Sequence, residues 1–229
     1  MFRDAFGHLR WIRGLMINLG GYLTILQLRV LNRLDITGVE NLRELPTRGV
    51  LLVSNHQTYY MDSIVVHHTV SYLHRPYLLW PRTLLYVVAA VETMEKSGWL
   101  PRVMAYNGTI NIKRTWREQG QAIERKVDPN DVARVGMGID DGWVLTYPQG
   151  TTAPGARGRK GCAQIIKRFR PLVVPVRLDG LRDTFDKTGF VLRRRGARLS
   201  VRYGAPLSID YEAPEEEILA QVMEAIGEA

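Results

Sequence analysis

Residues 50–62 read Val-Leu-Leu-Val-Ser-Asn-His-Gln-Thr-Tyr-Tyr-Met-Asp, an apolar run followed directly by a histidine and an acid. Such a run, bounded by polar residues, is typical of a buried strand, which sets the polar residues on the loop that follows. A histidine titrates near neutral pH and can take a proton from a hydroxyl, while a nearby carboxylate fixes its tautomer and stabilises its charged form. His56 and Asp62 are therefore candidates for a general base and its partner. The alternative is a purely structural histidine–acid pair.

Outside this stretch, short apolar runs alternate with helical segments, and no repeat or low-complexity region interrupts them. This alternation predicts a single α/β domain with a mixed, mostly parallel central sheet flanked by helices. The predicted strands are residues 49–53, 77–80, 109–113, 143–147, 172–176 and 198–203. The predicted helices are residues 63–73, 84–96, 116–125, 129–138, 161–168 and 214–226.

The composition indicates an anionic partner without choosing one. The chain has 229 residues, enough for a single core, and its 31 lysines and arginines against 23 acids give a formal net charge of +8. Nucleic acid, an anionic membrane face and phosphorylated substrates all fit that charge. The single cysteine, Cys162, excludes an internal disulfide framework and a cysteine-based zinc module.

The N-terminal segment has the pattern of a membrane-interfacial helix. Residues 14–28 carry no charge, and arginines flank them on both sides. These fifteen residues are too few for a perpendicular span, which needs about 20. Flanking arginines near lipid phosphates, with Trp11 and Tyr22 at headgroup depth, predict monotopic anchoring helices at 1–34 before the α/β domain at 35–229. An ordinary core helix is the alternative, and Gly20-Gly21 suits a turn between two helices in one leaflet.

Two further segments have features that suit an anion. Residues 108–114 read Gly-Thr-Ile-Asn-Ile-Lys-Arg, and strand alternation places Arg114 on the apolar face, where it needs a counter-anion such as a ligand phosphate. A solvent-exposed rim arginine fits that segment equally well. Residues 147–152 read Tyr-Pro-Gln-Gly-Thr-Thr, so that a strand ends at a turn whose backbone N–H groups can bind an oxyanion or a phosphate. A plain loop after a strand is the alternative there.

Taken together, these segments resemble the four motifs of the glycerolipid acyltransferase family, which contains the 1-acylglycerol-3-phosphate acyltransferases. The family's first motif, Asn-His followed by four residues and Asp, is similar to Asn55-His56, which five residues separate from Asp62. Its second motif, a glycine leading to a basic end, resembles residues 108–114, and its third, Phe-Pro-Glu-Gly-Thr-Arg, is similar to residues 147–152. The fourth, an apolar run with a central proline, resembles residues 173–176, and the whole resemblance spans roughly residues 35–207.

This resemblance implies a membrane-associated O-acyltransferase on the cytoplasmic side of the membrane. It would move a fatty acyl group from acyl-CoA or acyl carrier protein to the free hydroxyl of a lysolipid, with lysophosphatidic acid as the default acceptor and no metal or cofactor. The implied catalytic residues are His56 and Asp62. The implied substrate-binding residues are Lys113, Arg114, Gln149, Gly150 and Thr151. Because the sequence has no Gly-x-Ser-x-Gly elbow, we expect direct transfer without an acyl-enzyme.

Three departures from the family pattern define the alternatives. The extra residue before Asp62 requires His56 on the loop before a helix and the acid near its first turn, or else Asp62 only caps that helix. Gln149 replaces a glutamate and Thr152 replaces a basic residue, which makes a lysolipid with an amino-acid headgroup the nearest rival acceptor. An inactive lipid-binding scaffold of the same fold is a further alternative. The sequence has no recognised nucleic-acid motif, and we expect no nucleic-acid partner.

Overall fold

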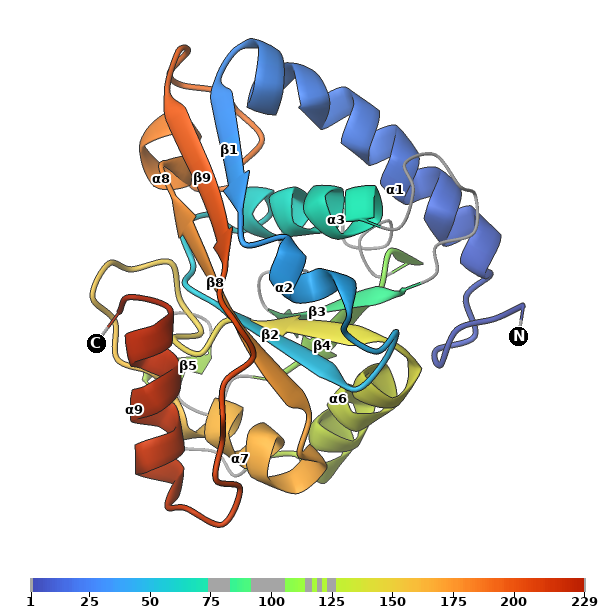
Figure 1. Cartoon of the computed structure of the whole chain (residues 1–229), viewed down its shortest axis with the longest axis vertical. Coiled ribbons are helices and arrows are strands. Elements are labelled where there is room, and N and C mark those ends of the chain that lie inside the picture. The colour runs from blue at the N-terminus through green and yellow to red at the C-terminus, as the bar shows by residue number, and fades with distance from the viewer. Residues whose placement is uncertain are drawn as a thin grey trace.

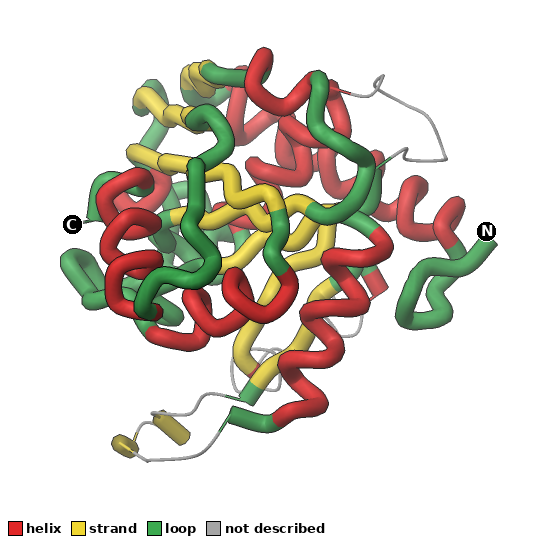
Figure 2. Tube along the Cα trace, turned by 60° about the horizontal axis from the view of Figure 1, so that its bottom comes forward, coloured by secondary structure: helices red, strands yellow, loops and turns green. Residues whose placement is uncertain are grey.

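A seven-stranded mixed sheet forms the centre of the computed structural model, in the order β1-β9-β8-β2-β7-β3-β4 (Figure 1). The structure describes residues 2–73, 83–91, 106–113, 117–118, 121–122 and 127–228. The strands of the sheet are β1 (Arg33–Thr37), β2 (Val50–Ser54), β3 (Leu85–Ala90), β4 (Thr109–Ile112), β7 (Trp143–Thr146), β8 (Leu172–Asp179) and β9 (Arg198–Tyr203). A separate antiparallel pair, β5 (Arg117–Glu118) and β6 (Gln121–Ala122), projects from the body of the domain (Figure 2).

Five strands, β8, β2, β7, β3 and β4, run parallel to one another, while β9 is antiparallel to β8. The whole of β2 is buried, as expected for a parallel strand whose two faces are both covered by helices. Within the sheet, Val53 pairs with Thr146 of β7 and with Pro175 of β8. The residues that follow these three strands therefore meet at one edge, where open α/β sheets place their ligands. The predicted mixed, mostly parallel sheet is confirmed.

Helices cover the two faces of this sheet (Figure 1). One face carries α2 (Glu40–Arg43), α3 (Met61–Leu73) and α8 (Leu181–Thr184), and the other carries α6 (Pro129–Asp141), α7 (Lys160–Phe169) and α9 (Glu215–Ala225). Alternate residues of β2 serve the two cores, because side chains of a strand point to opposite faces. Leu52 belongs to the same core as Val65 of α3, and Leu51 belongs to the same core as Ile166 of α7.

Two of the predicted helices are wrong. The segment predicted as helix 84–96 contains β3, whose run Leu85-Tyr86-Val87-Val88 is short, aromatic and β-branched and lies between β7 and β4. Such residues fit a strand buried on both faces better than a helix. The described residues of the predicted helix 116–125 form the β5–β6 pair. The predicted strand 77–80 lies outside the described residues, and β1 is absent from the prediction.

The N-terminal segment forms one long helix along the outside of α3 (Figure 1). Helix α1 (Arg10–Ile25) continues into the π-helical turn η1 (Leu26–Val30). Gly20 and Gly21 lie inside α1, so the predicted turn at these glycines is wrong. A Cβ atom on Gly21 would lie 3.7 Å from Nδ1 of His68, so that the glycine lies against α3 at this point. In the described part of the chain, no helix is long and apolar enough to cross a membrane.

One side of α1 and η1 is apolar and exposed. Its large side chains recur every three or four residues, which places them on one helix face, and each is at least 45% exposed. We call this set the apolar stripe, and it consists of Trp11, Leu15, Leu19, Tyr22, Leu23, Leu26 and Val30. Exposed apolar faces of this kind are typical of contact surfaces.

The opposite side of α1 is fixed to the domain by a buried arginine. Arg13 is fully buried and pairs with Asp4, at 2.6 Å between Nη1 and Oδ2. Its Nη2 atom donates to the carbonyl oxygens of Leu85 and Asn107, and its guanidinium lies over the ring of Tyr86 at 4.6 Å. A buried charge requires such partners, and the α/β domain supplies two of them to Arg13 of α1. Helix α1 is therefore packed into the domain rather than only tethered to it.

Candidate active site

The site lies where β2, β7 and β8 end. Asn55 and Gln57, on either side of His56, bind the main chain at the end of β8 and so hold the loop after β2 in place. Asn55 exchanges two hydrogen bonds of 2.8 Å with the backbone of Leu178. The side-chain oxygen of Gln57 accepts from the backbone N–H groups of Leu181 and Arg182, at 2.9 and 3.1 Å. His56 is thus carried by a loop with fixed ends rather than by a free one.

The structure brings His56 and Asp62 together. Nδ1 of His56 lies 2.8 Å from Oδ2 of Asp62, and the carboxylate is fully buried. Asp62 is the second residue of α3, and His56 lies on the preceding loop, as the spacing of the two residues predicts. The carboxylate reaches back to this loop, where it also accepts from the backbone N–H of Gln57 and from the N–H and hydroxyl of Thr58.

These contacts determine how His56 is oriented. Because an ionised carboxylate can only accept, a neutral imidazole in this contact carries its hydrogen at Nδ1 and its lone pair at Nε2. The side chain of His56 is 14% exposed, so that it is reachable from solvent. An imidazole held by an acid at Nδ1, with its lone pair at Nε2, has the arrangement of a general base.

Tyr147, the first residue after β7, supports the imidazole from its face. The two rings are stacked, with centroids 4.0 Å apart and planes 18° from parallel. Burial, followed by the nearby carboxylate of Asp62 and by Tyr203, raises the pKa of Tyr147 well above its ordinary value. The phenol therefore stays neutral and contributes an apolar surface against which the His56 ring is fixed.

The loop after Tyr147 is braced from within. Gln149 is 1% exposed, and its Nε2 atom donates to the carbonyl oxygen of Ala156 at 3.0 Å and to the carboxylate of Glu228 at 3.1 Å. Gly150 has a φ of +63° and its N–H closes a turn onto the carbonyl oxygen of Tyr147, so this N–H is already used. The hydroxyl of Thr151 accepts from the N–H of Ala153. Substrate binding by these residues stays a prediction.

The two basic residues of the second motif lie apart from His56 or outside the described chain. Lys113 follows β4, is exposed, and donates its backbone N–H to Asp131 at 2.8 Å. Strand β4 is three positions from β2 in the sheet, or roughly 14 Å at about 4.8 Å per strand. Arg114 lies outside the described residues.

A residue absent from the sequence prediction, Arg182, reaches the site from α8. Its Nη2 atom donates to the carbonyl oxygen of His56 at 3.2 Å and to that of Thr152 at 3.0 Å. The guanidinium therefore joins the first-motif loop to the third-motif loop, at the place where the family motif ends in a basic residue and this chain has Thr152. No sequence pattern indicates Arg182, because both of its acceptors are main-chain carbonyls that any residue can supply.

Cys162, the single thiol, is buried in α7, on the face of the sheet opposite α3. Burial raises the pKa of this thiol to about 12, so that it stays protonated near neutral pH. A protonated, enclosed thiol is a poor nucleophile, which is consistent with the expected absence of an acyl-cysteine intermediate.

A known enzyme shares this fold. The solved structures similar to it include the 1-acyl-sn-glycerophosphate (LPA) acyltransferase PlsC from Thermotoga maritima, with a TM-score of 0.62 and 16% sequence identity. The match covers 93% of this chain and 76% of that chain. A search of curated proteins finds no match to this sequence. At this identity the structural likeness establishes that the two proteins share a fold, and it does not by itself assign a family.

The profile of the Acyltransferase family matches residues 33–179, from the start of β1 to the end of β8. This match spans more than half of the chain and includes both His56 and Asp62. The chain belongs to the Acyltransferase family, and it is an acyltransferase.

Proposed function

We propose that this acyltransferase moves a fatty acyl group from acyl-CoA or acyl carrier protein to the free hydroxyl of a lysophospholipid. The proposed acceptor is 1-acylglycerol-3-phosphate, and the product is phosphatidic acid. The observation that carries the proposal is the 2.8 Å contact between His56 Nδ1 and Asp62 Oδ2, which leaves Nε2 to accept a proton.

In the proposed reaction, Nε2 of His56 takes the proton from the acceptor hydroxyl as its oxygen attacks the thioester carbonyl carbon. Asp62 stabilises the imidazolium that forms. The tetrahedral intermediate then collapses, the carbon–sulfur bond breaks, and the leaving thiolate takes the proton from His56. The products are an oxygen ester and a free thiol. No group on the protein is acylated, in agreement with the buried state of Cys162.

Arg182 supports an acceptor that carries a phosphate. Only its Nη2 atom is engaged, by His56 and Thr152, and among the described residues none accepts from Nε or Nη1. A guanidinium with two unused donor nitrogens, within 3.2 Å of the backbone of the base, can bind phosphate oxygens through charge-assisted hydrogen bonds. We therefore assign the headgroup contact to Arg182, whose guanidinium lies beside Thr152, at the position where the family motif often has a basic residue.

The apolar stripe supports contact with a lipid surface. Both substrates are amphiphiles, and an exposed apolar helix face beside the domain would lie in the membrane interface, where Trp11 and Tyr22 are favoured. We propose peripheral attachment through this face, on the cytoplasmic side, where acyl-CoA and acyl carrier protein are found. The enzyme would then take its acceptor directly from the bilayer.

The test is an acyl-transfer assay with labelled acyl-CoA and labelled acyl carrier protein on three acceptors. The acceptors are lysophosphatidic acid, a lysolipid with an amino-acid headgroup, and neutral monoacylglycerol. We expect lysophosphatidic acid to be preferred, and we expect His56→Ala and Asp62→Asn each to lower kcat by about 10²-fold or more. Arg182→Gln should raise KM for lysophosphatidic acid about 10-fold or more, with a smaller effect on monoacylglycerol.

Arg48→Gln, which removes an exposed arginine just before β2 at the opposite edge of the sheet, is the matched control and should behave as wild type. Full activity of His56→Ala would overturn the assigned base. An equal effect of Arg182→Gln on charged and neutral acceptors would overturn the headgroup contact. If the wild-type protein binds lipid but transfers an acyl group to none of the three acceptors, the proposed reaction would be overturned in favour of an inactive lipid-binding scaffold.

A further inference from the structure

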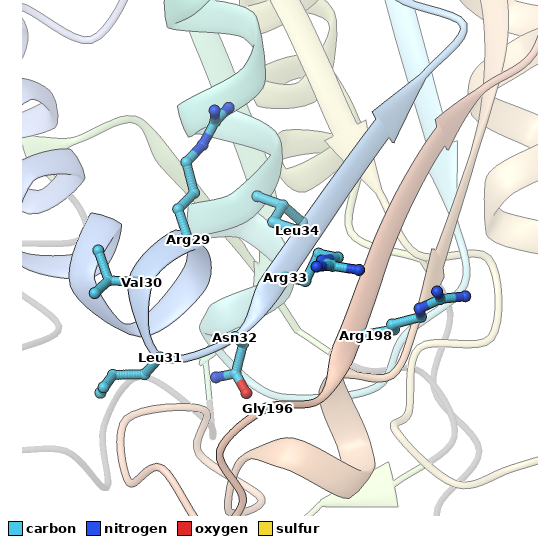
Figure 3. A pocket seen from close by; sticks show the side chains of 8 residues that line it. All are labelled: Arg29, Val30, Leu31, Asn32, Arg33, Leu34, Gly196 and Arg198. Atoms are coloured by element: carbon cyan, nitrogen blue, oxygen red, sulfur yellow. The ribbon is translucent and has the colours of Figure 1, made fainter.

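A basic pocket lies at the end of the apolar stripe. It has a volume of about 620 Å³ and is lined by the last residues of η1, the start of β1 and the start of β9. Figure 3 shows Arg33 and Arg198 side by side on the two neighbouring strands, with Arg29 on a different wall. Val30 lines the same pocket and is also a member of the apolar stripe, so the apolar and basic surfaces are continuous.

The two arginines are placed together by the register of the sheet. Arg33 and Arg198 are direct partners in the parallel pairing of β1 with β9, and both side chains are exposed. Like charges directly opposite each other on adjacent strands repel and destabilise the pairing. The next pair along the same face is Asp35 with Ser200, and in the described part of the chain neither arginine forms an ion pair.

The walls of the pocket are fixed by the main chain. Asn32 is 5% exposed; its amide donates to the carbonyl oxygen of Gln27, and its side-chain oxygen accepts from the N–H of Ala197. The N–H of Arg33 donates to Ala197, and the N–H of Gly196 donates to Leu31, at 2.9 and 2.8 Å. These hydrogen bonds join η1 to the chain before β9, and they hold the backbone from which Arg33 and Arg198 extend.

More positive charge and more apolar surface adjoin this pocket. Arg193, Arg194 and Arg195 are exposed and immediately precede Gly196 on its rim. The amide of Gln27 in η1 donates to the carbonyl oxygen of Phe190, next to Val191, which is 60% exposed. A ligand that satisfies this surface needs an anionic group for the arginines and an acyl chain or a bilayer for the apolar side chains.

We infer that Arg33 and Arg198 bind the phosphate headgroup of an anionic phospholipid in the membrane on which the apolar stripe lies. Two adjacent guanidinium groups can share the oxygens of one phosphate, which relieves their mutual repulsion. This lipid is part of the bilayer and is neither the acceptor nor the product at His56. The inference rests on the proposed attachment of the enzyme to a membrane and adds which lipids it selects.

The experiment is a flotation assay of the full chain with two kinds of vesicle, phosphatidylcholine alone and equimolar phosphatidylcholine and phosphatidylglycerol. Wild type should bind the anionic vesicles more tightly, and added salt should weaken that binding. The double variant Arg33→Gln/Arg198→Gln should bind the anionic vesicles roughly 30-fold more weakly. Arg43→Gln/Arg48→Gln, which removes the same charge from the opposite edge of the sheet, should stay within about twofold of wild type.

Equal binding of both vesicle types by wild type would overturn the inference, as would an unchanged affinity in the Arg33/Arg198 double variant or an equal loss in the control pair. The inference would also be overturned if the protein did not bind vesicles but bound an RNA oligonucleotide through Arg33 and Arg198. The assay contains no acyl donor, and His56→Ala should bind vesicles as wild type does. Failure of the acyl-transfer reaction is thereby separated from failure of the lipid site.

Discussion

At the scale of single residues, the site depends on side chains that bind the main chain. Asn55 and Gln57 bind Leu178 of β8, Gln57 also accepts from the N–H of Leu181 in α8, and Arg182 donates to the carbonyl oxygens of His56 and Thr152. The imidazole itself has one acid partner and one aromatic neighbour. Most of the described polar groups around His56 therefore position it, while Arg182 keeps Nε and Nη1 without an acceptor among the described residues.

Gln149 allows a prediction at this scale. Gln149→Glu restores the residue that the family motif has, but it places a carboxylate about 3 Å from that of Glu228 in a buried position. We expect this variant to lower the free energy of unfolding by roughly 1–3 kcal/mol, measured by urea denaturation. The exchange Gln149→Glu/Glu228→Gln should recover most of that loss. A single variant as stable as wild type would contradict the assigned contact.

At the scale of elements, α3 carries a buried histidine, His68, that lies near Gly21 of α1 and resists protonation. Burial, followed by the positive charge of Arg29, lowers the pKa of His68 to about 4, while His67 beside it has a pKa lowered to about 3. In the unfolded chain both histidines have a pKa near 6.5. At pH values between the folded and unfolded pKa, the unfolded state binds more protons than the folded state. The stabilisation that the folded state gains from its neutral histidines is therefore complete above pH 6.5 and is lost as the pH falls towards 4.

We therefore predict that His68 contributes about 1 kcal/mol to acid destabilisation between pH 7.5 and pH 5, after allowance for solvent screening. Urea denaturation at the two pH values measures this change. His68→Gln should show a shallower dependence of stability on pH, and the remaining slope includes His67. Identical slopes for wild type and His68→Gln would show that His68 already titrates normally in the folded protein.

At the scale of the whole molecule, the N-terminal helical segment and the sheet share one core, and we expect them to unfold together. Leu28 of η1 is fully buried in the same core as Leu52 of β2, and Arg13 donates to the carbonyl oxygens of Leu85 in β3 and of Asn107 just before β4. Deletion of residues 2–30 should therefore lower the free energy of unfolding by at least about 3 kcal/mol, measured by urea denaturation of the truncated chain. A truncated chain with the same unfolding midpoint as the full chain would show that α1 is only an attached anchor.

The sequence predicts the central strands and the His56–Asp62 pair because both depend on local pattern. The apolar run at 50–53 indicates a buried segment. Helix geometry shows that His56 and Asp62, six positions apart, cannot lie on one face of a single helix. The sequence does not predict β3, since the run at 85–88 fits a buried helix or strand equally well until its neighbours β7 and β4 are known. Arg182 and the Arg33–Arg198 pair depend on contacts between distant segments, for which one sequence has no local pattern.

The anchoring of Asn55 and Gln57 to β8 has a consequence for how the protein can change over time. Asn55 and Gln57 hold His56 through bonds to Leu178 that do not involve residues 58–60. An additional residue in the bend at 58–60 would first alter the bonds of Thr58 to Asp62 and of Tyr59 and Tyr60 to Lys187 and Thr188, and we expect His56 to keep its place. We therefore expect the spacing between the two proposed catalytic positions to vary during evolution, provided that the carboxylate still returns to Nδ1. Searches that demand a fixed number of residues between histidine and aspartate will overlook such enzymes.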